Sequence, residues 1–311
     1  MSGRFYVGVD FGGSTIRVGS LTVEGDFEGV ARATLARSDS ASEVIERAGS
    51  MIDEVIGART GELAGIGLAV TGPVDVTTGL VANPWTLPSL TGTDVRRPFE
   101  DRYRVPVVIE NDADAAALGD YFCGGGSRVD SLAMVTVGTG IGVALVRDGR
   151  VFRGGNAYHQ EAGHHAVADT GPTCYCGIDG CWEQLASGPA LLREAEAAIR
   201  DGGWDPGGAI TSARDVTAAA DAGDPVALAL VAQVGFYLGR GLRNIEAFYA
   251  PARIAIGGGL GQRFDLLAAG IENGRAPASS LSPRAHVVAS SLGDDAGVIG
   301  AACSVRARLT G

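Results

Sequence analysis

Three cysteines and a histidine in the middle of the chain have the spacing of a metal site. Cys174, Cys176 and Cys181 lie within eight residues, and His164 lies ten residues before the first of them. Three thiolates and one imidazole form a closed tetrahedral set for zinc, with no open position for a catalytic water. We therefore predict a structural zinc site rather than three buried free thiols. The neighbouring His165 could replace His164 as ligand, and the sequence leaves this choice open.

Two glycine-rich turns have the composition of phosphate-binding loops. The two runs are Asp10-Phe11-Gly12-Gly13-Ser14-Thr15 and Gly138-Thr139-Gly140-Ile141-Gly142. Backbone N–H groups and hydroxyls in such turns bind phosphate, and a carboxylate at a strand end, here Asp10, suits Mg²⁺, often through water. Either run alone could be an ordinary hairpin turn. The two together favour a polyphosphate ligand, which this chain would hold without any lysine.

Several carboxylates lie where they could act on a hydroxyl substrate. Glu110-Asn111-Asp112 stands where an apolar strand ends and a helix is expected to begin. Capping of that helix is the first interpretation, and a general base beside a hydroxyl is the second. Glu161 and Glu183 flank the zinc motif, where they are either acceptors for sugar hydroxyls or solvated acids.

A third glycine run follows an apolar strand near the end of the chain. Residues 257–259 are all glycine and precede a predicted helix. Glycines at such a point allow a bulky or flat ligand to approach the backbone. A simple helix-entry turn would have the same sequence, so this motif gains weight only from the others.

The elements that must position these motifs alternate between strands and helices. Apolar runs predict strands near 5–9, 16–23, 29–35, 65–70, 105–109, 132–137, 143–147, 253–256 and 286–289. Helical spacing predicts helices near 40–56, 113–122, 189–200, 213–222, 224–248, 264–272 and 294–308. Each half begins with a strand, a glycine-rich turn and a return strand. We expect a duplicated α/β unit with a ligand cleft between its halves.

Length and composition exclude several classes of protein. A chain of 311 residues suggests two domains, and 48 glycines suggest tight turns or close approach of backbone to a ligand. The net charge of −11 argues against nucleic acid as a partner. The chain has no lysine, which excludes a Walker-type phosphate loop and a Schiff base.

Hydropathy and cysteine count indicate where the protein works. We expect neither an apolar stretch of about 18 residues nor an N-terminal leader in this sequence. We therefore predict a soluble cytoplasmic protein without a membrane partner. Five cysteines, an odd number, argue against a disulfide framework. Cys123 and Cys303 lie outside the zinc motif and have no assignment.

Taken together, these motifs resemble the ROK family (repressors, uncharacterised frames and sugar kinases) over nearly the whole chain. The most specific part is Glu161-x-x-His164 followed by Cys174-x-Cys176-Gly177-x-x-Gly180-Cys181-x-Glu183. The resemblance implies an α/β fold with two RNase H-like domains of the actin and hexokinase type and an active cleft between them. We expect a smaller domain at 1–110, to which a helix at 295–311 returns, and a larger domain with the zinc loop at 111–294.

The resemblance also implies an activity and a site. The activity is ATP-dependent phosphorylation of the 6-hydroxyl of a hexose, either glucose or a close analogue, with Asp112 as the base. The implied sugar ligands are Gly72, Asn111, Asp112, Glu161, His164 and Glu183. The implied nucleotide and Mg²⁺ ligands are Asp10, Gly12, Gly13, Ser14, Thr15, Gly138, Thr139, Gly140, Gly257, Gly258 and Gly259. The implied cofactors are ATP, Mg²⁺ and a structural Zn²⁺, and the implied assembly is a homodimer or homotetramer.

Two departures from the family pattern keep alternatives open. Glucokinase-like members carry small Gly and Ala residues where this chain has Ala157-Tyr158-His159-Gln160, and Asp114 replaces an asparagine. Such residues near the sugar would suit an aminosugar kinase acting on kanosamine, N-acetylmannosamine or N-acetylglucosamine. The other alternative is a non-catalytic sugar-sensing regulator. Regulators carry a helix-turn-helix before the first phosphate motif, which the few residues before Asp10 are not expected to hold.

Overall fold

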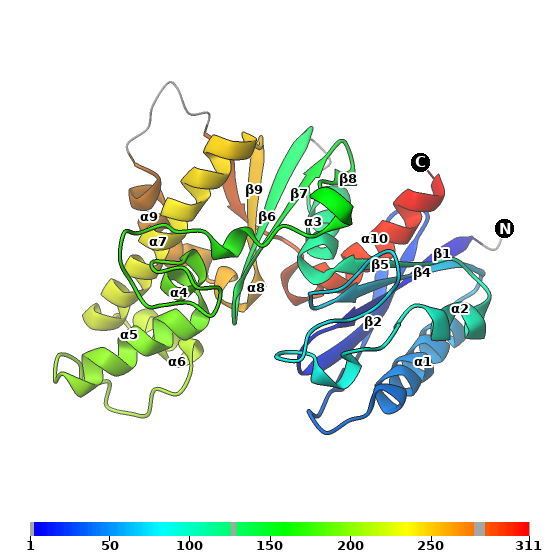
Figure 1. Ribbon diagram of the computed structural model, residues 1–311, viewed down its shortest axis with the longest axis horizontal. Coiled ribbons are helices and arrows are strands. Elements are labelled where there is room, and N and C mark those ends of the chain that lie inside the picture. The colour runs from blue at the N-terminus through cyan, green and yellow to red at the C-terminus, as the bar shows by residue number, and fades with distance from the viewer. Residues whose placement is uncertain (1–2, 126–128, 277–283, 311) are drawn as a thin grey trace. The chain divides into compact units, whose positions relative to one another are not determined.

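The structure is a computed structural model that describes residues 3–125, 129–276 and 284–310 (Figure 1). The chain folds into two compact units. The first comprises Met1–Ser131, Ala144–Gln160 and Asp294–Gly311, and the second comprises Leu132–Val143 and Glu161–Gly293.

A five-stranded sheet with the order β3-β2-β1-β4-β5 forms the centre of the first unit. Its strands are β1 (Arg4–Phe11), β2 (Thr15–Thr22), β3 (Phe27–Thr34), β4 (Glu62–Val70) and β5 (Val107–Asn111). The first three strands are antiparallel, whereas β1, β4 and β5 run parallel. The carboxyl ends of β1 and β5 therefore place Asp10 and Asn111 at the same edge of the sheet.

Among the residues that the structure describes, the α-helices of the first unit are α1 (Ala41–Gly57), α2 (Arg97–Tyr103), α3 (Asp112–Cys123) and α10 (Ala296–Thr310). Helix α10 returns from the end of the chain to pack on β1, β4 and α3. Glycine is required where α10 crosses the sheet, because a Cβ at Gly8 would lie 2.0 Å from the carbonyl oxygen of Val298. At Gly67 it would lie 1.7 Å from the carbonyl oxygen of Ala301.

The second sheet has the order β10-β9-β6-β7-β8. Its strands are β6 (Ser131–Val137), β7 (Ile141–Arg147), β8 (Arg150–Val151), β9 (Arg253–Gly257) and β10 (His286–Ala289). Strands β6, β9 and β10 are parallel, and β7 and β8 are antiparallel. The helices of the second unit are α4 (Trp182–Ala186), α5 (Gly188–Arg200), α6 (Ala213–Asp221), α7 (Pro225–Tyr249), α8 (Gly258–Gly261) and α9 (Phe264–Arg275). Both sheets are mixed, so the α/β class predicted from the sequence is confirmed.

Helix α7 is long and apolar enough to cross a membrane, so the expectation that no stretch reaches that length was wrong. Its packing accounts for the apolar composition. A Cβ at Gly239 would lie 2.2 Å from the carbonyl oxygen of Ile271, and one at Gly274 would lie 1.9 Å from that of Phe236. Glycines on both α7 and α9 thus let the two helix backbones touch, and we interpret α7 as a core helix of the second unit.

The compact units do not coincide with the domain limits expected at residue 110, and those limits stay a prediction. Helix α3, expected to open the larger domain, belongs to the first unit because it packs closely on α10. A Cβ at Gly300 would lie 1.6 Å from the carbonyl oxygen of Ala115, which shows how close the two helices are.

Candidate active site and metal centre

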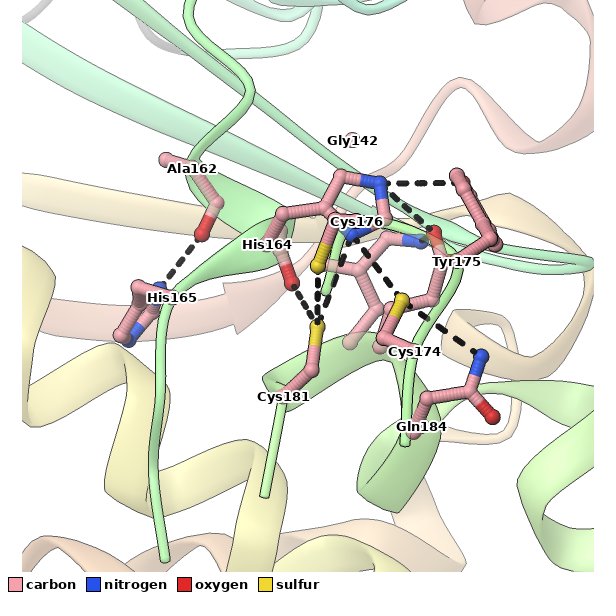
Figure 2. A network of polar contacts seen from close by, with 12 residues as sticks. Gly142, Ala162, His164, His165, Cys174, Tyr175, Cys176, Cys181 and Gln184 are labelled. Carbon is pink, nitrogen blue, oxygen red and sulfur yellow. Dashed lines mark hydrogen bonds and ion pairs between the residues drawn. The ribbon is translucent and has the colours of Figure 1, made fainter. Parts of the chain in front are cut away.

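The four residues predicted to bind zinc come together in the second unit (Figure 2). Nδ1 of His164 lies 3.6 Å from Sγ of Cys174 and 3.5 Å from Sγ of Cys181, and Sγ of Cys176 lies 3.9 Å from Sγ of Cys181. Zn–S and Zn–N bonds of about 2.3 and 2.0 Å at tetrahedral angles place sulfur ligands about 3.8 Å apart and nitrogen about 3.5 Å from sulfur. The observed distances fit these values, so the residues present suit a tetrahedral zinc ion.

The structure decides between the two adjacent histidines. Nδ1 of His165 contacts the carbonyl oxygen of Ala162 at 2.5 Å, and its ring packs on Trp182. Figure 2 shows this side chain turned away from the thiols, whereas His164 lies among them. The two side chains diverge because His164 ends a short 3₁₀ helix (Ala162–His164) and His165 is already in extended backbone.

Local backbone geometry explains the glycines of the metal loop. Gly177 and Gly180 have φ of 85° and 64°, in the left-handed region that favours glycine. The N–H of Gly177 donates to the carbonyl of Cys174 at 2.8 Å and closes the turn that holds the first two thiols. A Cβ at Gly180 would also lie 2.2 Å from the carbonyl oxygen of Ala168. The spacing C-x-C-G-x-x-G-C therefore encodes the shape of the loop as well as its ligands.

The second imidazole nitrogen of His164 faces polar groups outside the thiol cluster. Its Nε2 lies 3.0 Å from the hydroxyl of Tyr175 and 3.9 Å from Oε2 of Glu183. Tyr175 is otherwise exposed, with its ring edge on His164. One imidazole thus has a nitrogen for metal and a nitrogen for a polar ligand.

Glu183 connects this centre to the second glycine turn. Its carboxylate is buried and accepts a hydrogen bond from the N–H of Ile141 at 3.1 Å. A Cβ at Gly140 would lie 2.5 Å from Oε2 of Glu183, so this turn needs glycine to admit the carboxylate. Glu161, by contrast, is exposed at the start of the 3₁₀ helix.

The second and third glycine runs lie side by side in the second unit. Parallel pairing of β6 with β9 sets Thr136 opposite Gly257, so the turn at 138–140 and the run at 257–259 leave the same edge of the sheet. Gly258 has φ of 80° and touches the backbone of Val137. Gly259 is exposed with open space around its Cβ position. Packing therefore explains Gly258, and the open approach for a ligand is at Gly259.

Asp10 and the first glycine turn are in the first unit. The Asp10 carboxylate is buried and accepts a hydrogen bond from the cross-strand neighbour Arg17 at 3.2 Å. Burial raises the pKa of Asp10 to about 6, and the nearby Asp112 carboxylate adds to the rise, while Arg17 opposes it. A Cβ at Gly297 would lie 2.9 Å from the carboxylate. Gly13 and Ser14, at the tip of the turn, are exposed.

Asn111 and Asp112 stand at the start of α3, as the helix-boundary signal predicted. Asn111 is the N-cap, and its side chain accepts from the N–H of Ala113 at 2.9 Å. Asp112 follows as the first helical residue and is half-buried. Burial raises the pKa of its carboxyl, while the hydroxyl of Thr71 and the imidazole of His159 lower it. Asn111 thus caps the helix, and the adjacent Asp112 is left as the candidate base.

Asn83, for which the sequence analysis gave no structural role, fixes the loop that carries Gly72. The buried side chain of Asn83 donates to the carbonyl of Gly72 at 2.5 Å and accepts from the N–H of Thr86 at 3.0 Å. A Cβ at Gly72 would lie 2.4 Å from Nδ2 of Asn111, so Gly72 touches the cap residue directly.

Sequence reasoning also missed a charged network behind Asp112. Asp114 is buried and lies 2.9 Å from Nδ1 of His159 and 3.6 Å from Nε of Arg153, which in turn pairs with buried Glu110. The network joins α3 to the segment that precedes Glu161. The only advance signal was that Asp114 and His159 are both departures from the family pattern.

The two mixed sheets and the metal loop define a protein of the class to which sugar kinases with the actin and hexokinase fold belong. The family model for the ROK family matches residues 6–308. This chain belongs to the ROK family. It is 32% identical to a glucokinase of Halalkalibacterium halodurans over 96% of this chain and 94% of that protein.

Solved structures agree with this family. A ROK hexokinase from Thermus thermophilus has a TM-score of 0.85 at 29% identity and covers 98% of this chain and 99% of its own. A glucokinase from Streptomyces griseus in complex with glucose and AMPPNP has a TM-score of 0.80 at 28% identity over 97% and 99% of the two chains. Regulators also occur among the relatives: a xylose repressor of Bacillus subtilis is 32% identical over 62% of this chain and 48% of its own length.

Proposed function

We propose that this protein is an ATP-dependent sugar kinase that phosphorylates the 6-hydroxyl of a hexose, glucose or a close analogue. The observation that carries the proposal is Asp112, a carboxyl with a raised pKa at the start of α3, in a chain that aligns end to end with glucokinases. The Streptomyces griseus relative, with glucose and AMPPNP bound, supports the sugar and the nucleotide as substrates.

In this mechanism Asp112 accepts the proton of the sugar hydroxyl as that oxygen attacks the terminal phosphate of ATP. General-base help of this kind contributes roughly 10²–10⁴ to the rate, and positioning contributes much of the rest. Asn111 caps the first turn of α3 and so positions Asp112, which is the next residue. We assign Asn111 and Gly72 to the sugar as well.

We also assign substrate contacts to residues of the second unit. Glu161, Glu183 and Nε2 of His164 would accept or share hydrogen bonds with sugar hydroxyls. Gly138, Thr139 and Gly140 would bind phosphate oxygens, and the open backbone at Gly259 would lie along the nucleoside. A structural zinc ion would be held by His164, Cys174, Cys176 and Cys181 and would fix the orientation of the imidazole.

The first glycine turn is proposed to bind phosphate through Gly12, Gly13, Ser14 and Thr15, with Asp10 as the carboxylate toward Mg²⁺. Mg²⁺, when bound, neutralises charge that develops on the transferred phosphate. Asp10 must be ionised for this role, and with a pKa of about 6 it is ionised near neutral pH. The dimer or tetramer and the cytoplasmic location stay predictions.

An ADP-release assay with Mg·ATP over a panel of sugars tests the proposal. The panel contains glucose, mannose, fructose, N-acetylated hexosamines and amino-glucoses. We expect a hexose to stimulate ADP release many-fold over the sugar-free rate. Preference for an amino-glucose or an N-acetylhexosamine would favour the aminosugar kinase. No stimulation by any sugar, together with sugar binding in calorimetry, would favour the regulator.

A further inference from the structure

Two cysteines outside the metal site face each other across a helix pair in the first unit. Sγ of Cys123, at the end of α3, lies 3.6 Å from Sγ of Cys303, in the middle of α10. The two residues are separated by 180 positions in the chain. We propose that Cys123 and Cys303 form a reversible disulfide that ties the end of α3 to α10.

The packing of the two helices brings the cysteine backbones into range. A Cβ at Gly119 would lie 2.8 Å from the carbonyl oxygen of Ala296 and 3.0 Å from the backbone nitrogen of Gly300. Cys123 follows Gly119 by one turn on the same face of α3, and Cys303 follows Gly300 by about one turn on α10. Disulfides need cysteines on closely approaching backbones, and these glycine contacts supply that approach.

The two thiols differ in how an oxidant reaches them. Cys303 is fully buried, whereas Cys123 is only half-buried. The Cys303 thiol lowers the pKa of Cys123 to about 7 by hydrogen bonding, and the guanidinium of Arg306, which lies over the ring of Phe122, acts in the same direction. Cys123 is therefore the nucleophile that meets solvent, and Cys303 is the resolving thiol behind it.

The oxidant is a low-molecular-weight disulfide. The Cys123 thiolate attacks one of its sulfur atoms, forms a mixed disulfide and releases the first small thiolate. Sγ of Cys303 then attacks Sγ of Cys123 and expels the second small thiolate. The proton of the Cys303 thiol passes to this small thiolate. Two protein thiols are oxidised to one disulfide, and one small disulfide is reduced to two thiols.

Peptide mapping after oxidation tests the proposal. The folded, zinc-loaded protein is incubated with oxidised glutathione, its free thiols are blocked, and trypsin cleaves it after arginine without reduction. We expect peptides 105–128 and 285–306 to appear as one linked species, two hydrogen atoms lighter than their sum, that dithiothreitol separates. Cys123→Ser, which keeps the three metal-site cysteines, should not give this species.

Thermal unfolding supplies a second readout that does not depend on any kinase activity. A cross-link that closes a loop of 180 residues should raise the melting temperature of the wild-type protein by roughly 5–10 °C. Cys123→Ser should show no such rise after the same treatment. A peptide map that shows Cys123 only as a glutathione adduct, or linked to a cysteine other than Cys303, would overturn the proposal.

Discussion

Asp10→Asn should stabilise the protein at pH 8 more than at pH 5, because the wild-type protein keeps a buried carboxylate at that position. Burial raises the pKa of Asp10 from 3.8 to about 6, which corresponds to about 3 kcal/mol against the ionised form. A raised carboxyl pKa means that the folded protein binds this proton more tightly than the unfolded chain. The associated stability is therefore present below pH 3.8 and is lost as the pH rises through about 6.

The assay is urea unfolding of the wild-type protein and of Asp10→Asn at both pH values, without nucleotide or Mg²⁺. About 1.4 kcal/mol of the effect falls between pH 5 and pH 8, so the stability advantage of the variant should grow by that amount, or roughly 0.5–1 M in urea midpoint. The contact with Arg17 lowers the pKa of Asp10, so its effect is already contained in the net rise to about 6. An advantage that is independent of pH, or that shrinks toward pH 8, would refute the reasoning.

Three further predictions concern the metal loop and the groups around Asp112. Cys181→Ser should reduce bound zinc from one per chain to well below one in elemental analysis; full zinc content in this variant would reject the ligand set. His159→Ala should move the acidic limb of the pH profile of kcat to higher pH, because the imidazole of His159 lowers the pKa of Asp112. An acidic limb at the wild-type pH would contradict this effect of His159 on Asp112. Tyr175→Phe removes the hydroxyl that contacts Nε2 of His164, so it should change the sugar KM by roughly 2- to 10-fold with little effect on kcat. An altered kcat at constant KM would contradict a role of this hydroxyl in sugar binding.

The sequence was most informative where short spacing encodes both chemistry and backbone shape. The three cysteines Cys174, Cys176 and Cys181 were predictable from spacing alone, and the short loop narrowed the fourth ligand to one of two adjacent histidines. The start of α3 was also predictable to within one residue, since Asn111 is a strong N-cap. By contrast, the choice between His164 and His165 needs the backbone direction at the end of a 3₁₀ helix, which composition does not encode.

Contacts between distant residues were beyond the reach of sequence patterns. The pair of Asp114 and His159 joins residues 45 positions apart, and its partners come from a loop without periodicity. The short helices α2 and α4 were missed because of their length. They have 7 and 5 residues, which is too few for a helical hydrophobic repeat to be recognised in the sequence. The glycine run at 257–259 left two interpretations open, a ligand contact and a helix-entry turn. Packing against β6 accounts for Gly258, and the ligand contact stays a prediction.

Turnover of Asp112→Asn tests the central claim most directly. The measurement is ADP release with Mg·ATP and the best hexose of the panel. Asp101→Asn, at an exposed position on α2, serves as the matched control, and circular dichroism checks that both variants fold. The account predicts that Asp112→Asn lowers kcat by roughly 10²–10⁴ while the control keeps wild-type turnover. Near-normal turnover in a folded Asp112→Asn variant would contradict it.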